Sequence, residues 1–198
     1  TYKMGIDTLF NLRRQLMQTL VSFKEDLCRE DFNAIPFINA DGYHSKTIAY
    51  SIWHIFRIED IVAHTVITED EQVFFTGNYQ VRINSPIITT GNELVKQQIA
   101  DFSKQLNLEE LYSYIFEVRE STEKILERFS YDELKWKIPD ERKGYLKSLN
   151  VVNCDEKAIW LIDYWCSKDI RGLIQMPFSR HWIMHTEACL RIKDKIQS

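Results

Sequence analysis

The chain has 198 residues, 44% of them hydrophobic and 13% aromatic, which predicts one globular domain with an ample core over residues 1–198. The net charge of −4 and the scattered basic residues argue against nucleic acid as a partner. No apolar run reaches the roughly 18 residues of a membrane span, and the chain opens into an amphipathic segment rather than a signal peptide, so we expect a cytoplasmic protein with no membrane partner.

The first two predicted helices differ in how much of their surface is apolar. Leucines at three- and four-residue steps predict an amphipathic helix over about 7–28. A loop over 29–44 then leads to Ser45, the expected N-cap of a second helix over about 46–67. This second helix is apolar on nearly every side, so His54, which lies in its middle, is predicted to be buried.

A long connection separates the second helix from the third long one. Residues 69–91 mix aromatic and polar side chains, which predicts a loop with short extended pieces. Such a loop serves either as a lid over a site or as a passive packed excursion, and both interpretations stay open. A helix over 92–105 follows, and unbroken three-four periodicity predicts another over 107–129, with Asn107 as N-cap and Glu110 at the capping-box position.

The last third of the chain carries a loop and two helices. The loop runs from about 139 to 155, a Trp- and Tyr-rich helix spans about 157–167, and the final helix spans about 179–195. With the helices at 7–28, 46–67 and 107–129, the final helix makes four long helices. The expected fold class is therefore all-α, a four-helix bundle with accessory helices.

Three histidines carry the chemistry. His181 and His185 are four residues apart in a core-facing stripe, so both imidazoles lie on one helix face and can turn toward a single ion. His54 on a facing helix would complete three nitrogen ligands, the number found in catalytic zinc-type sites with open positions. The alternative is three core histidines bonded to carbonyls or carboxylates, but one divalent cation satisfies all three at once.

Other residues near these histidines have less specific patterns. Arg57, one turn after His54, is expected either to bind an anionic substrate group or to form a salt bridge with a neighbouring carboxylate. Arg180 is expected to be partly exposed where the last helix begins. The carboxylates that could orient an imidazole N–H are Glu59, Asp60, Asp163 and Glu187.

The remaining histidines and the cysteines are expected to lie outside the site. His44 and His64 are predicted at the surface, because neither shares a helix face with the three. Cys189, one turn after His185, drifts off the ligand face and is expected as a small buried hydrophobic residue. No CxxC pair occurs, so reduced core thiols are predicted at Cys28, Cys154, Cys166 and Cys189.

Two known metal motifs are absent. Residue 182 is Trp, so the His181/His185 pair is not the HExxH motif and lacks its general base. No Glu-x-x-His occurs, which disfavours a carboxylate-rich di-iron bundle.

The stretches Ile52–Asp60, with one histidine, and Met176–His185, with the HxxxH pair, resemble the DinB/YfiT-like superfamily. The resemblance covers essentially the whole chain through helix order and spacing. It implies one divalent metal, zinc or nickel, on His54, His181 and His185. It also implies an enzyme that uses a low-molecular-weight thiol, such as bacillithiol or mycothiol, for S-transfer to an electrophilic substrate or for isomerisation, although many members of the superfamily have no known activity. A homodimer is a further expectation.

Three classes of function therefore remain open. The first is a metal-dependent thiol S-transferase or a related hydrolase, whose catalytic residues the sequence does not identify. The second is a non-catalytic, stress-associated metal-binding bundle, and the third is a structural interaction domain with ordinary core histidines. Metal content separates the third class from the others, and turnover separates the first from the second.

Overall fold

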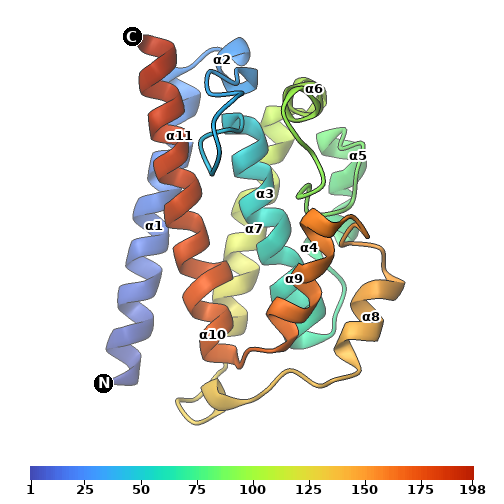
Figure 1. Ribbon diagram of the computed structural model, residues 1–198. Coiled ribbons are helices and arrows are strands. Elements are labelled where there is room, and N and C mark those ends of the chain that lie inside the picture. Colours follow the sequence, from blue (N-terminus) through green and yellow to red (C-terminus); the bar gives the residue numbers. More distant parts are fainter.

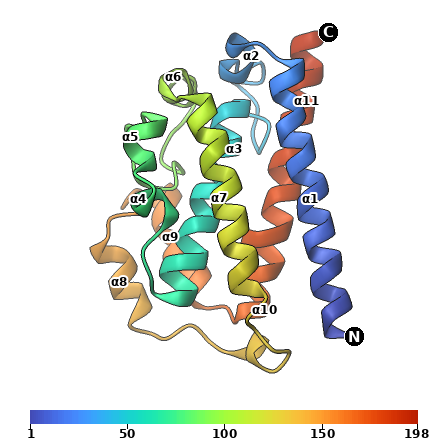
Figure 2. The same ribbon diagram turned by 180° about the vertical axis from the view of Figure 1, so that it is seen from behind.

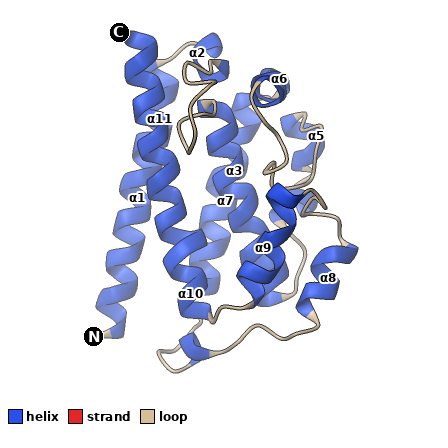
Figure 3. Ribbon diagram, viewed as in Figure 1, coloured by secondary structure: helices blue, strands red, loops and turns tan.

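The computed structural model describes residues 1–198 and is helical throughout, with no strand (Figure 3). This confirms the all-α prediction. The four longest helices stand side by side in Figure 1, and we call them the frame helices. They are α1 (Tyr2–Asp26), α3 (Ile48–Asp60), α7 (Leu108–Leu126) and α11 (His181–Gln197).

The frame helices run in two directions. In Figures 1 and 2, α1 and α11 rise from the end that holds the N-terminus, whereas α3 and α7 run the opposite way. Helix α3 packs against both α7 and α11, and α1 packs against α11. Because α3 and α7 are neighbours with the same direction, the chain must cross the length of the molecule between them. This requirement explains the long connection after α3.

The crossover is built of short helices rather than the extended pieces that the sequence predicted. It contains α4 (Val73–Thr76), α5 (Tyr79–Ile83) and α6 (Gln97–Gln105). The buried Asp60 carboxylate accepts hydrogen bonds from the backbone N–H groups of Val73 and Phe74, at 2.9 and 2.8 Å. A carboxylate at these N–H groups satisfies donors that have no partner within α4.

The second connection returns from α7 to α11 at the same end of the molecule. It contains η2 (Glu133–Lys135), α8 (Arg142–Ser148), α9 (Glu156–Cys166) and α10 (Ile170–Gln175). Residues 139–155 were predicted as a loop, and α8 corrects that prediction. The buried Arg142 side chain fixes α8 by donating to the carbonyl oxygens of Thr65 and Val66, at 2.8 and 2.6 Å.

Two helices contain wide π-helical turns. Helix α3 continues as η1 (Ile61–Thr68), and α10 continues as η3 (Met176–Arg180), which leads directly into α11. Pro177 has no N–H to donate and its ring crowds the preceding turn, so a regular α-helix cannot pass through it. The predicted final helix over 179–195 is therefore preceded by an irregular turn beside His181.

The predicted N-cap was right for α7 and wrong for α3. Asn107 is the N-cap of α7, as predicted, and its side chain accepts from the Glu110 N–H. The Glu110 carboxylate does not bond back to the cap, because it accepts from Arg82 instead. Thr47, not Ser45, caps α3, and its hydroxyl accepts from the Tyr50 N–H. A short helix α2 (Arg29–Asn33) interrupts the predicted loop over 29–44.

A buried network around one ion pair joins all four frame helices. The Arg13 guanidinium on α1 is fully buried and donates to both carboxylate oxygens of Glu59 on α3, at 2.9 and 2.7 Å. It also donates to the Phe178 carbonyl at 2.8 Å and to Glu123 of α7 at 3.1 Å. The Trp182 indole N–H donates to Glu59 at 2.6 Å. Arg13 thus ties the start of α11 to α3.

No helix is both long and apolar enough to cross a membrane.

Candidate metal centre

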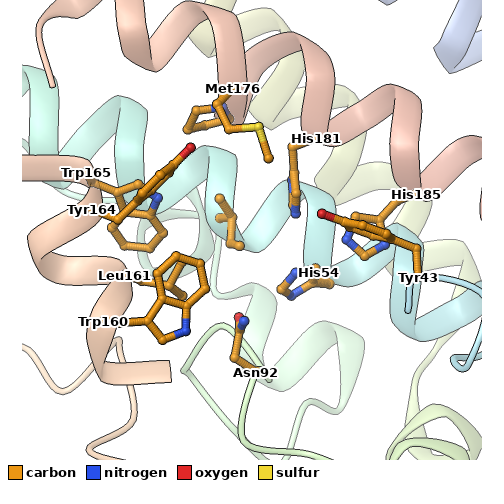
Figure 4. Close-up of a pocket in the computed structure, with 12 residues that line it drawn as sticks. Tyr43, His54, Asn92, Trp160, Leu161, Tyr164, Trp165, Met176, His181 and His185 are labelled. Carbon is orange, nitrogen blue, oxygen red and sulfur yellow. The ribbon is translucent and has the colours of Figure 1, made fainter. Parts of the chain in front are cut away.

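The three imidazoles converge. One nitrogen from each of His54, His181 and His185 lies within 4.8 Å of the others. The ring centroids are 4.6–5.1 Å apart. Two nitrogens on a tetrahedral zinc are roughly 3.4 Å apart, given bonds of about 2.05 Å, so small side-chain rotations would close this group onto an ion. The predicted convergence is confirmed, and Figure 4 shows the three rings around one point.

The chemistry of the three rings fits a metal. All three side chains are at most 6% exposed, and burial lowers the pKa of each, that of His54 to about 4. The imidazoles are therefore neutral at pH 7, the form that ligates. The Nδ1 atoms of His181 and His185 are buried without a hydrogen-bond partner. A buried polar group without a partner is costly, so these rings fit a ligand better than an ordinary core role.

The crossover fixes the His54 ring. The Nδ1 of His54 lies 2.6 Å from the Thr90 carbonyl oxygen, and because a carbonyl only accepts, Nδ1 carries the proton. Nε2 is then the free ligand atom. Gly91 makes this approach possible, because its φ is +76° and an added Cβ would lie 2.8 Å from the Trp53 ring. Part of the 69–91 segment therefore supports a candidate ligand, which neither the lid nor the passive interpretation anticipated.

The His181/His185 pair is placed by contacts outside its own helix. Its spacing puts both rings on one face of α11. The Arg13 and Glu59 network holds Phe178 and Trp182 on either side of His181. The edge of the Tyr43 ring packs on His185 with centroids 4.8 Å apart.

A cavity of about 220 Å³ opens beside the histidines (Figure 4). The three histidines form one wall, and α9 forms the opposite wall with aromatic side chains. In Figure 4 the Tyr43 hydroxyl and the Asn92 amide point into the space next to the rings. The Asn92 Oδ1 is buried and has no hydrogen-bond partner. An open space beside three ligands provides the vacant position that a catalytic metal site needs.

A second cavity of about 250 Å³ also reaches His54 and His185, and it shares Tyr43 and Asn92 with the first. Lys46 lines it, half-buried and without an ion-pair partner among the carboxylates of the chain. Burial is the main cause of the lowered pKa of His54 and His185, and the positive charge of Lys46 lowers both values further. Lys46 is therefore a cation that lines a cavity at the candidate site, a position that one of the two predictions for Arg57 had given to Arg57.

Arg57 does not line either cavity. Its fully buried guanidinium donates to the Ile88 carbonyl and to Gln72 Oε1, both at 2.7 Å, and lies 3.7 Å from Asp60. The predicted substrate contact is therefore wrong, and the salt-bridge alternative is the one observed. The guanidinium ties the crossover to α3, which is a structural role.

None of the four candidate carboxylates orients an imidazole. Glu59 and Asp60 are used by the Arg13 network and by α4. Asp163 is exposed and pairs with Lys143, and Glu187 is exposed beside a different cavity. The orienting group is instead the Thr90 carbonyl, which carries no charge and so leaves no sequence signal.

The residues expected outside the group do lie outside it. Cys189 is buried and away from the ligands, as predicted, but Cys28 and Cys154 are exposed rather than in the core. His64 is buried, not at the surface, with its two nitrogens at 2.6 Å from Asp70 and 2.9 Å from Ser121. His44 is half-buried against Phe37. Arg180 is exposed at the start of α11.

Comparison with known proteins supports the fold and says nothing about the function. No protein-family profile and no curated protein matches the sequence. The chain is similar to a conserved protein from Enterococcus faecalis known from its crystal structure. The TM-score is 0.67 at 10% sequence identity, over 100% of this chain and 97% of that one. The similarity spans the whole molecule, so the complete helical arrangement, not just the frame, has a counterpart among solved structures.

Proposed function

We propose that this protein is a four-helix bundle of the DinB/YfiT-like type that binds zinc or nickel through His54, His181 and His185. The observation that carries the proposal is the convergence of three buried, neutral imidazoles beside an open cavity. The up-down-down-up order of α1, α3, α7 and α11 agrees with it, because α3 and α11 face each other and carry the ligands (Figure 1).

We further propose that the bound metal serves thiol S-transfer. A divalent cation held by His54, His181 and His185 would supply Lewis acidity that lowers the pKa of a thiol. In thiol S-transfer the sulfur would form a bond to an electrophilic carbon, whose leaving group departs with the bonding electron pair, and the thiol proton would pass to solvent. His54 and His185 line both cavities, so a thiol in one cavity and an acceptor in the other can reach the same histidines.

The side chains around the histidines have distinct roles in this reaction. Lys46 binds an anionic group of the thiol, because it is a half-buried ammonium with no ion-pair partner of its own. The Tyr43 hydroxyl and the Asn92 amide offer hydrogen bonds to the acceptor or to its leaving group (Figure 4). The aromatic wall of α9 excludes water from the reacting atoms.

The test begins with metal content and then turnover. Protein purified without a histidine tag is analysed for metals, and is then assayed with bacillithiol, mycothiol, glutathione and cysteine against several electrophiles. We expect bound zinc or nickel and thiol consumption above the metal-free control. His54→Ala should abolish both, and His44→Ala is the matched control because His44 lies outside the group. Metal without turnover for every pair would move the protein to the non-catalytic, metal-binding class.

The role of Lys46 has a separate test. N-acetylcysteine carries a carboxylate and N-acetylcysteamine does not, but their thiols are otherwise similar. Lys46→Met should raise KM for the first about tenfold and leave the second nearly unchanged, because a contact made in both ground and transition states affects KM rather than kcat. Equal effects on the two thiols would remove Lys46 from thiol binding.

A further inference from the structure

The cavity beside the histidines is apolar on the side that faces away from them. Four residues on one face of α9 line the cavity: Trp160 and Leu161, and one turn later Tyr164 and Trp165. Trp165 is 1% exposed and forms the interior, whereas Trp160 is 49% exposed and stands at the rim. Figure 4 shows these rings across the space from His54 and His181.

Charged side chains are absent from the lining. Ile58 of α3 and Met176 and Pro177 of η3 complete it, the hydroxyl of Tyr164 adds one polar group on α9, and no Asp, Glu, Lys or Arg reaches the cavity. The polar lining atoms near the centre belong to the histidines, Tyr43 and Asn92. A ligand in this space is therefore oriented, with an uncharged apolar part against α9 and its polar or reactive atom toward the histidines.

The size of the cavity limits the apolar part. An engineered apolar cavity of about 150 Å³ is known to hold one benzene molecule. A volume of about 220 Å³ accommodates one substituted ring. We expect a fused two-ring system with a reactive group to require displacement of Trp160, which stands at the rim. The electron-rich faces and electron-poor edges of three aromatic side chains favour an aromatic ring over an aliphatic group of equal area, because a face of one ring attracts an edge of another.

We propose that the acceptor substrate is a single-ring aromatic compound that binds against α9, with Trp160 and Tyr164 as the residues that determine specificity. This inference rests on the proposed function for the reaction, but ring binding depends only on the cavity. The reactive atom of the acceptor would lie beside the histidines, and the thiol would arrive from the Lys46 side.

The first measurement needs no metal. Benzyl alcohol is titrated into metal-free protein, and the indole N–H signal of Trp165 is followed by NMR. We expect a saturable shift, which Leu161→Trp should abolish by filling the space. Trp160→Ala, at an exposed position that the fold tolerates, should weaken binding at least fivefold, and Trp136→Ala, exposed and outside the cavity, should leave it unchanged. Absence of a saturable shift in the wild type would overturn the inference.

The second measurement uses cobalt-loaded protein and hydroxamates, with the visible spectrum as the readout. Burial of one ring predicts that benzohydroxamate binds roughly 10- to 100-fold more tightly than acetohydroxamate, and that 2-naphthohydroxamate loses this advantage. Equal affinity for the first two would overturn the inference while leaving the metal site intact. Failure to load cobalt, zinc or nickel would instead refute the proposed function, and the benzyl alcohol titration would then decide the inference alone.

Discussion

Replacement of Arg13 by Met tests whether the buried ion network holds α11 against α3. Met is apolar and long enough to fill much of the space of Arg13, so the change mainly removes the charge and its donors. Glu59 then keeps a fully buried carboxylate whose remaining partner is the Trp182 indole N–H. The Phe178 carbonyl also loses its Arg13 donor.

The expected loss follows from the uncompensated charge. Breaking a buried ion pair by removing one partner costs about 3–5 kcal/mol, because the other charge stays out of water. A domain of this size loses roughly 2–4 °C of Tm per kcal/mol, so Arg13→Met should melt about 6–20 °C lower. Urea unfolding followed by circular dichroism gives the free energy, and a thermal scan gives Tm.

Two further variants separate the charge from the packing. Arg13→Met combined with Glu59→Gln removes both charges and should recover much of the stability, since an uncharged amide still accepts from Trp182. Lys124→Ala breaks the exposed pair with Glu120 and should cost less than about 0.5 kcal/mol. The reasoning is refuted if Arg13→Met loses less than about 1 kcal/mol, or if the double variant is no more stable than the single one.

Three predictions concern the candidate metal centre. Zinc or nickel at about 100 times its Kd should stabilise the protein by about 2.7 kcal/mol and raise Tm by roughly 5–11 °C. His54→Ala should remove this increase, and His44→Ala should not. Identical melting curves with and without metal would contradict the prediction. With a chelator present, acid should destabilise the fold, because burial lowers the folded-state pKa of His54 from 6.5 to about 4. The contribution of this residue is intact above pH 6.5 and is lost as pH falls toward 4, with about 2 kcal/mol lost by pH 5. Urea unfolding at pH 7.5 and 5 measures this loss, and equal free energies at the two pH values would show that the imidazoles are not buried in the neutral form. Gly91→Ala should lower metal affinity roughly 10- to 100-fold. The added Cβ, at φ +76° and 2.8 Å from the Trp53 ring, should displace the Thr90 carbonyl that orients His54. If isothermal titration shows unchanged affinity, the Thr90 carbonyl does not contribute to metal binding.

The sequence determined which side chains share a helix face. His181 and His185 are four residues apart, and the rise and turn of an α-helix place them together whatever surrounds them. His54 was predicted to be buried because its helix is apolar nearly all round, and every residue of α3 is indeed buried. These inferences needed only local periodicity, and the all-helical fold followed from the same signal.

Periodicity does not say which residues of other elements meet a given face. Arg57 is one turn from His54, and the sequence left open whether it binds substrate or a neighbouring carboxylate. The tertiary structure turns it toward Gln72 and the crossover. Lys46, Thr90 and Asn92 lie outside regular helix and have no period from which their direction can be predicted. Each reaches the histidines only because the crossover and the loop before α3 fold back over the frame.

Charge inside the core was likewise decided by tertiary contacts. Arg13 and Glu59 look like solvent-facing residues in a helical sequence, because isolated charges are too costly to bury. They are buried because each satisfies the other at 2.7 Å, and this pairing joins residues 46 positions apart. A partner that distant in the chain is fixed by how whole helices pack, so the local sequence of either residue does not contain it.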